Sequence, residues 1–274
     1  MKGLIRSLIL LVPCTCITIF AHAQDVFRSS ADTTGKPALT AAMRQPPKGP
    51  KPITGEASFG YRLHTNGWST YVDLGKVKST NSKQADMFYN VTYLQLEFSE
   101  KKSNKQEKLT SEVNNGNGNP KYIYGKINNF YALKLGIGYR KMLAGKPDPG
   151  SVSIHWSNVI SGSLGMQKPY YLNVYSDPNA IKYEEDSKTM FLAKSFITGS
   201  AGFGTGLSEI KMIPGGHFKS MLHFDFAANR KKVVGVETGI SIDYYAEPVV
   251  LMVNQESKPY FIDLFMAFQF GKRW

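Results

Sequence analysis

Apolar and polar side chains alternate along this chain with a period of two, and that alternation is the feature that most constrains its fold. In the segment 234–244, one set of alternate positions is mainly apolar and ends in an aromatic residue: Val234, Val236, Thr238, Ile240, Ile242 and Tyr244. The positions between them hold Gly235, Glu237, Gly239, Ser241 and Asp243. Because successive side chains of a strand point to opposite faces, this segment predicts a strand with one apolar and one polar face.

The same pattern returns along the chain. It is clear at 131–139, 218–226 and 260–270, and weaker at 57–63, 68–74, 94–98 and 152–156, and a further strand is expected within 191–207. Several runs reach about nine to twelve residues, the length that a tilted strand needs to cross the hydrocarbon layer of a membrane. Strands of ordinary globular proteins are shorter, about five or six residues.

These segments predict an all-β fold, an antiparallel transmembrane β-barrel. A membrane protein without spanning helices must close its sheet, because lipid satisfies no open sheet edge. Single-chain barrels normally have an even number of strands, and the sequence offers nine candidate segments. Either one of the nine is not a barrel strand, or residues 170–175 form a tenth. Eight strands are expected and ten are the alternative. A soluble periplasmic barrel or sandwich also alternates, but aromatic residues at the ends of the apolar faces favour the membrane barrel: Tyr131, Tyr139, Tyr244, Tyr260 and Phe270.

The first 23 residues have the composition of a signal peptide. Lys2 and Arg6 precede an apolar run that is short for a membrane span, and Ala21-His22-Ala23 matches a small-x-small cleavage site. We expect cleavage after Ala23 and export to the outer membrane. Residues 24–54 are rich in proline and predict a flexible segment, and residues 55–274 are expected to form the barrel domain.

Both cysteines, Cys14 and Cys16, lie in the predicted signal peptide, so the mature chain has no disulfide and no thiolate. Loss of Lys2 and Arg6 lowers the formal net charge from +12 to +10. For an exported basic protein, the expected partners are outer-membrane lipid and the phosphates of lipopolysaccharide, together with the machinery that assembles barrels, and not nucleic acid. The sequence does not define an oligomeric state.

Further residues carry a resemblance to known proteins. The Ala23-Gln24 junction, the proline-rich segment, the amphipathic strands and the aromatic C-terminus Phe268-Gln269-Phe270-Gly271-Lys272-Arg273-Trp274 resemble outer-membrane β-barrel proteins of the Bacteroidetes. The segments 162–171 and Pro214-Gly215-Gly216 resemble a largely uncharacterised family of these barrels. The resemblance covers residues 55–274 and implies a location and a fold, not an activity.

The polar faces of the predicted strands direct charged side chains to the lumen. These residues are Arg62, Lys134, Arg140, Lys219, His223, Asp225, Glu237, Asp243 and Asp263. Mixed charges in a narrow interior are expected to pair, since an unpaired buried charge costs several kcal/mol. A polar conduit or a ligand site is the alternative interpretation. By contrast, residues 99–118, which include Lys101, Lys102, Lys105 and Lys108, are expected to form a solvated loop.

One local pattern points to chemistry. His155-Trp156-Ser157-Asn158 places His155 and Ser157 on one strand face and resembles the His-x-Ser-Asn motif of outer-membrane lipid A deacylases. No acidic residue follows at a suitable distance. We therefore predict a structural, adhesion or small-solute passage role without catalysis, with the hydrolase and a soluble binding protein as alternatives. The histidines lack metal-ligand spacing and no cofactor motif occurs, so neither a metal nor a cofactor is expected.

Overall fold

The computed structural model describes residues 53–79, 89–113, 120–145 and 150–274. The predicted signal peptide, and all of the predicted flexible segment except its last two residues, lie outside the described residues. Within the described ranges, no helix has the length and apolar character required to cross a membrane.

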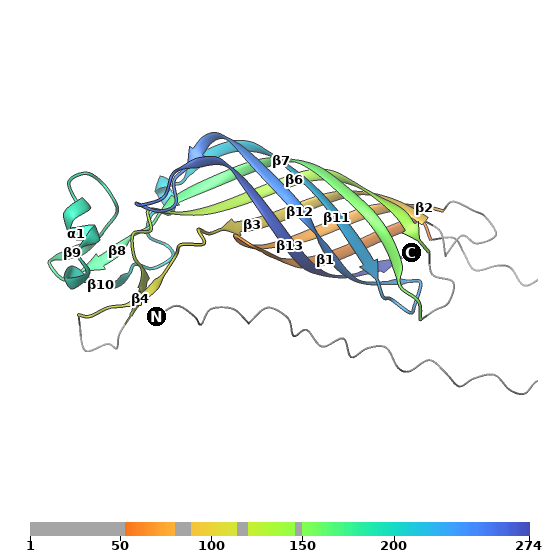
Figure 1. The fold of residues 1–274 in the computed structure, drawn as a ribbon, viewed down its shortest axis with the longest axis horizontal. Coiled ribbons are helices and arrows are strands. Elements are labelled where there is room, and N and C mark those ends of the chain that lie inside the picture. The colour runs from red at the N-terminus through yellow and green to blue at the C-terminus, as the bar shows by residue number, and fades with distance from the viewer. Residues whose placement is uncertain (1–52, 80–88, 114–119, 146–149) are drawn as a thin grey trace, which may run out of the picture. The chain divides into compact units, whose positions relative to one another are not determined.

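Eight long strands form one closed antiparallel sheet (Figure 1). They are β1 (Gly55–His64), β2 (Gly67–Ser79), β3 (Tyr89–Lys101), β6 (Asn128–Ala144), β7 (Ser153–Pro169), β11 (Lys211–Asp225), β12 (Lys232–Val249) and β13 (Lys258–Arg273). The barrel closes because β1 pairs with both β2 and β13. The prediction of an all-β barrel with eight strands is confirmed, and ten strands is wrong.

The register between strands follows the alternation in the sequence. Ile242 of β12 lies opposite Phe218 of β11 and Ile262 of β13, and all three side chains are exposed on the outside. A slip by one residue would bring the buried polar residues of one strand to the outside, so the polarity of the two faces fixes the pairing.

One of the nine predicted strand segments does not belong to the barrel. Within 191–207, only β10 (Ile197–Ser200) is a strand, and it pairs with β8 (Leu172–Val174) in a separate three-stranded sheet that also contains β9 (Asp177–Ile181). The segment 170–175 supplies β8 to this small sheet and is not a tenth barrel strand. The odd number of candidates therefore arose from a false barrel strand.

Two connections between barrel strands fold together into what we call the loop module. Besides β8, β9 and β10 it contains β4 (Lys108–Thr110), β5 (Lys121–Ile123), α1 (Lys188–Leu192) and the 3-10 turn η1 (Lys194–Phe196), and a second 3-10 turn, η2 (Leu207–Glu209), follows it. Its buried apolar residues are Tyr122, Leu172, Phe191 and Ile197. The hydroxyl of Ser111 donates a hydrogen bond to the carbonyl of Ile197 at 2.7 Å, which joins the two connections.

The two ends of the barrel differ in their connections (Figure 1). At one end, here called the turn end, β11 and β12 are joined by a tight turn in which the side chain of Asn229 accepts a hydrogen bond from the amide of Lys231. The barrel's first and last strands also meet there, since the amide of Trp274 donates to the carbonyl of Gly55 at 3.0 Å. The opposite end carries the loop module and is called the loop end.

Candidate functional site

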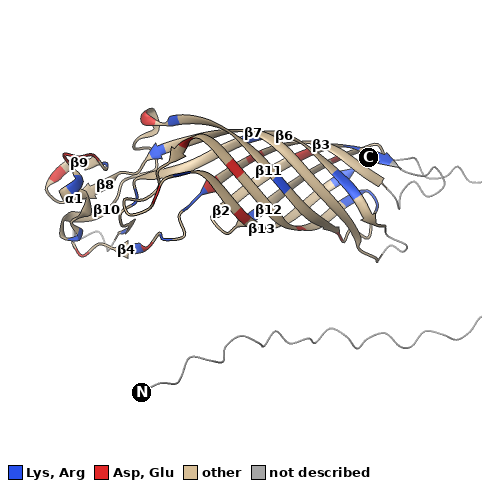
Figure 2. Cartoon of the chain, turned by 45° about the horizontal axis from the view of Figure 1, so that its top comes forward, with Lys and Arg blue, Asp and Glu red and all other residues tan. Residues whose placement is uncertain are grey.

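Charged residues recur along the strands of the barrel (Figure 2). Many of their side chains are buried in the interior of the barrel. The structure places all nine sequence-predicted lumen residues there, each at most 1% exposed. These are Arg62, Lys134, Arg140, Lys219, His223, Asp225, Glu237, Asp243 and Asp263. An ion removed from water needs close partners of opposite charge, so the contacts among these residues decide what the interior can do.

Glu97 is the centre of the middle layer. Its carboxylate accepts from Arg62 at 2.5 Å and from Lys219 at 2.5 Å, and the ammonium of Lys134 lies 3.5 Å away. The other side of the Arg62 guanidinium reaches Glu237 at 3.2 Å. These contacts pair the buried charges with one another and leave the middle of the barrel occupied by side chains.

A second layer lies toward the loop end. The ammonium of Lys101 bridges Asp243, at 2.9 Å, and Asp263. The carboxylate of Asp243 also forms an ion pair with the ammonium of Lys134 at 2.7 Å, and it lies 2.8 Å from Nδ1 of His217. Asp263 in turn accepts from the amide of Asn66 at 3.2 Å, which ties the β1–β2 turn to the interior.

A third layer lies toward the turn end. Glu56 accepts from Arg140 at 2.7 Å and from Arg273 at 2.7 Å. The guanidinium of Arg273 also forms an ion pair with Asp225 at 2.8 Å. Each layer therefore combines acidic and basic side chains, as expected for charges that fill a narrow barrel.

Sequence reasoning missed several members of these layers and misassigned one. Lys101 was expected in a solvated loop, but β3 continues through it and the side chain is 1% exposed. The signal was present, because Gln95, Glu97, Ser99 and Lys101 keep the period of two on the inward face. Glu56 and Arg273 were missed because both lie at strand ends, beyond the clear part of the alternation.

An apolar layer covers the charges at the loop end. It contains Phe130, Ala132, Ile213, Tyr245, Val249, Leu251 and Met252. The rings of Phe130 and Tyr245 pack edge to face with centroids 4.9 Å apart. Beside this layer, Lys126 lies close to the ring of Tyr170, and burial lowers the pKa of its ammonium to about 8.

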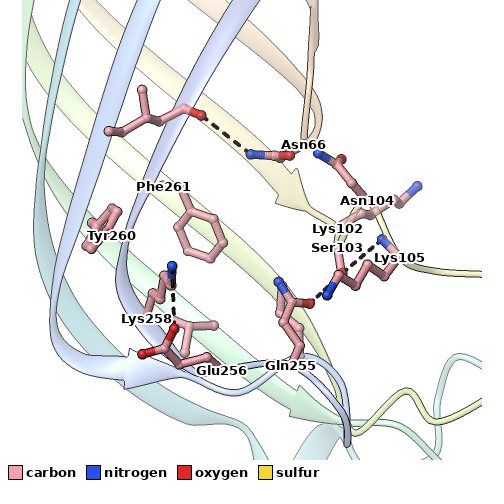
Figure 3. Close-up of a pocket in the computed structure, with 13 residues that line it drawn as sticks. Asn66, Lys102, Ser103, Asn104, Lys105, Gln255, Glu256, Lys258, Tyr260 and Phe261 are labelled. Atoms are coloured by element: carbon pink, nitrogen blue, oxygen red, sulfur yellow. Dashed lines mark hydrogen bonds and ion pairs between the residues drawn. The ribbon is translucent and has the colours of Figure 1, made fainter.

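A pocket of about 390 Å³ opens at the loop end (Figure 3). Three lysines line it, and two of them pair with nearby acids: Lys102 with Glu100 at 3.0 Å and Lys258 with Glu256 at 3.5 Å. Phe261 forms part of the apolar wall. Because its charges are largely paired, the pocket has no clear preference for an ion of one sign.

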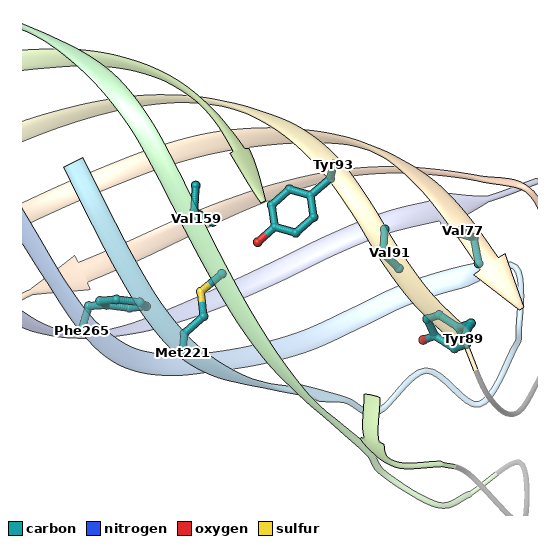
Figure 4. Close-up of a cluster of buried hydrophobic side chains, with 7 residues drawn as sticks. All are labelled: Val77, Tyr89, Val91, Tyr93, Val159, Met221 and Phe265. Atoms are coloured by element: carbon teal, nitrogen blue, oxygen red, sulfur yellow. The ribbon is translucent and has the colours of Figure 1, made fainter. Parts of the chain in front are cut away.

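A further cluster of buried apolar residues lies in the interior of the barrel (Figure 4). Its members are Val77, Tyr89, Val91, Tyr93, Val159, Met221 and Phe265. The hydroxyl of Tyr89 donates to Asp225 at 3.0 Å, so aromatic and charged layers interlock. An eight-stranded barrel is just wide enough for side chains to fill, and here they do so.

His155 and Ser157 both face this interior and are fully buried. Ser157 shares a hydrogen bond with the hydroxyl of Tyr93 at 2.6 Å. Neither ring nitrogen of His155 has a hydrogen-bond partner among the residues that the structure describes. The structure therefore does not contain the serine–histidine hydrogen bond that activates a nucleophile. Among the described residues, no group of three or more His, Cys, Asp or Glu is placed to hold a metal ion.

The outward face of the barrel is apolar between two levels of aromatic residues. Near the loop end, four aromatic rings on neighbouring strands form a row. Their ring centroids are 6.0 Å apart for Tyr61 and Trp68, 6.1 Å for Trp68 and Phe98, and 5.9 Å for Phe98 and Tyr131. Toward the turn end, the exposed aromatic residues include Tyr139, Trp156, Phe226, Phe270 and Trp274. On β6, the outward residues between the two levels are Leu133, Leu135 and Ile137, all more than 40% exposed.

Comparison with known proteins adds similarities but no role. No protein-family model matches the chain, and no curated protein matches it. Among solved structures, the chain is similar to Neisserial surface protein A, with 7% identity and a TM-score of 0.41 over 81% of this chain and 97% of that one. It is similar to the outer membrane enzyme PagL, with 9% identity and a TM-score of 0.36 over 79% and 98%. It is also similar to Ail, the attachment invasion locus protein of Yersinia pestis, with 9% identity and a TM-score of 0.36 over 82% and 100%.

Proposed function

We propose that this chain is an integral outer-membrane protein whose filled barrel anchors the loop module at the cell surface. The observation that carries the proposal is the reversed polarity of the barrel, apolar outside and charged inside. A soluble β-protein buries its apolar faces, whereas lipid requires them outside. In this proposal the protein contacts outer-membrane lipid and lipopolysaccharide and is inserted by the barrel-assembly machinery.

The spacing of the aromatic levels supports insertion in a bilayer. A rise of about 3.3 Å per residue and a tilt near 40° place Tyr131 and Tyr139 roughly 20 Å apart along the barrel axis. That separation, with the rings themselves added, is close to the height of about 25 Å found for the apolar band of such barrels. The residues between the two tyrosines on the outward face are aliphatic.

The connections support one orientation. Outer-membrane barrels have short turns on the periplasmic side and longer loops on the outside of the cell. The loop end carries the connections 102–127 and 170–210, so we place it outside and the turn end in the periplasm. The loop module is then the part of the chain that a partner on another surface could reach, which supports a structural or adhesion role.

Labelling of intact cells tests the location and the orientation together. Both cysteines fall within the predicted signal peptide, so a single introduced cysteine would report one site. We expect Tyr175→Cys, in the loop module and 75% exposed, to react with a membrane-impermeant maleimide on whole cells. Lys231→Cys at the turn end should react only after lysis. Release of the protein from membranes by carbonate would contradict the proposal, and the reverse labelling pattern would invert the orientation.

The proposal also states that the protein neither catalyses a reaction nor lets solutes pass through the barrel. The filled interior supports a closed barrel, and the lack of a hydrogen bond between His155 and Ser157 supports a role without hydrolysis. We expect no stable conductance steps in planar bilayers and no release of acyl chains from lipid A. Acyl release that His155→Ala abolishes would replace this proposal by the hydrolase. The Bacteroidetes origin stays a prediction from the sequence.

A further inference from the structure

Among the described residues of the turn end, the outward charged side chains are positive. Six exposed lysines lie there: Lys76, Lys78, Lys141, Lys231, Lys232 and Lys272. The described acids of this end, Glu56 and Asp225, face inward and bind Arg140 and Arg273. Among the described residues, no outward acidic side chain therefore neutralises these lysines.

Two of the lysines face each other directly. Lys232 of β12 and Lys272 of β13 are cross-strand partners in the register. Like charges directly opposite each other destabilise a sheet, so an anion beside the two ammonium groups would stabilise this pair.

An apolar groove of about 540 Å³ lies on the outward face beside Lys76. Leu74, Leu94 and Ile137, from three neighbouring strands, form its wall, and Trp274 lies at its edge. The indole of Trp274 fills the space beside Gly55, where an added Cβ would be 2.6 Å from the ring. Glu56 contributes to the lining, but its carboxylate is held by the two arginines inside the barrel.

We propose that this groove and the adjacent lysines bind an anionic glycerophospholipid. One acyl chain lies along Leu74, Leu94 and Ile137, and the phosphate of the headgroup contacts Lys76 and Lys78. The apolar wall with cations at one end matches a molecule that has a hydrocarbon chain and a negative headgroup. The inference rests on the proposed function, because the groove must face a bilayer, and it adds a lipid preference that bilayer insertion alone does not require.

Quenching of tryptophan fluorescence by brominated lipid tests the preference. The chain has three tryptophans, so Trp68→Phe/Trp156→Phe leaves Trp274 as the reporter beside the groove. The mature protein is inserted into phosphatidylcholine vesicles that contain a minor fraction of brominated phosphatidylglycerol or brominated phosphatidylcholine, equal in both leaflets. We expect phosphatidylglycerol to be enriched about fivefold near Trp274 at low salt, and less at high salt.

Matched variants locate the effect. Lys76→Gln/Lys78→Gln should abolish the preference, whereas Lys211→Gln/Lys188→Gln, at the loop end, should preserve it. A protein that keeps only Trp68 should be quenched equally by both lipids. Equal quenching of Trp274 by the two lipids, or a preference that survives Lys76→Gln/Lys78→Gln, would overturn the inference while leaving membrane insertion intact. No quenching by either lipid would overturn the proposed function as well.

Discussion

The outward surfaces of the two ends of the barrel differ in charge, whereas their interiors are alike. At the loop end, some outward lysines have acidic partners, as in Lys102 with Glu100 at 3.0 Å and Lys182 with Glu209 at 2.6 Å. At the turn end, the outward lysines have no acidic partner among the described residues. Inside, the loop-end layer around Lys101 and the turn-end layer around Arg140 both pair every carboxylate with a cation.

The difference separates two physical requirements. Burial forces charges to pair in the interior, because an isolated ion in a low-dielectric environment costs several kcal/mol. No such requirement acts on an exposed side chain, since water screens it. If the proposed orientation is right, the outward charge of each end matches what that end contacts, which is water around the loop module at one end and a membrane surface at the other.

The largest expected effect comes from removal of one interior cation at either end. Arg140→Met leaves Glu56 with Arg273 alone, and Lys101→Met removes the bridge between Asp243 and Asp263. Loss of one partner of a buried ion pair costs about 3–5 kcal/mol, so both variants should lower the free energy of unfolding in urea by similar amounts. Tyr139→Phe, an outward neighbour of Arg140, is the control. A large loss at only one end would show that the two interiors are not equivalent.

A smaller effect is expected in the band between the two ends. Arginine at the bilayer midplane costs about 2–4 kcal/mol in such barrels, and the cost falls toward the interfaces. Ile240→Arg should therefore reduce the folded fraction in lipid bilayers, measured by heat-modifiable gel mobility. Ala246→Arg, on the same outward face of β12 but beyond Tyr244, should have little effect. Equal folding of both variants would mean that the outward face does not meet hydrocarbon.

Much of the barrel could be predicted from the sequence because each strand has a different environment on each face. The false candidate at 191–207 shows the limit of this reasoning. Its apolar residues Phe191 and Ile197 belong to the core of the loop module and not to an outward face. Local alternation cannot distinguish these two kinds of burial, since both remove an apolar side chain from water.

The ion pairs of the interior could not be predicted in the same way. The alternation indicates that Asp243 and Asp263 face inward, but it does not show which cation they share. Lys101 is more than a hundred residues away from both in the chain and lies next to Lys102, so it resembled part of a solvated cluster. The partner becomes evident only when the barrel closes and its strands face one another across the lumen.

The next prediction concerns the loop end alone. Phe191 is fully buried in the loop module, and a Phe-to-Ala change in a core costs about 3–5 kcal/mol of the local unfolding free energy. Phe191→Ala should make the module sensitive to protease, while the barrel keeps its heat-modifiable mobility and unfolds with a nearly unchanged midpoint. Met190→Ala, an exposed neighbour, is the control. If Phe191→Ala also lowered the unfolding midpoint of the barrel, the loop module would be shown to stabilise the strands.

The smallest expected effect comes from the outward charges of the turn end. Lys232→Glu converts the like-charged pair with Lys272 into an opposite pair. Cross-strand pairs contribute about 0.2–1 kcal/mol, so the variant should be slightly more stable than the parent protein in a zwitterionic detergent, and less so as salt is added. Lys231→Glu changes the net charge equally but is not opposite Lys272, so it should stabilise less. In vesicles rich in phosphatidylglycerol, Lys232→Glu should instead be less stable than the parent protein, because it removes a cation from the membrane surface. Equal stabilisation by both variants would indicate an effect of net charge, and the difference between the two ends would then not depend on this pair.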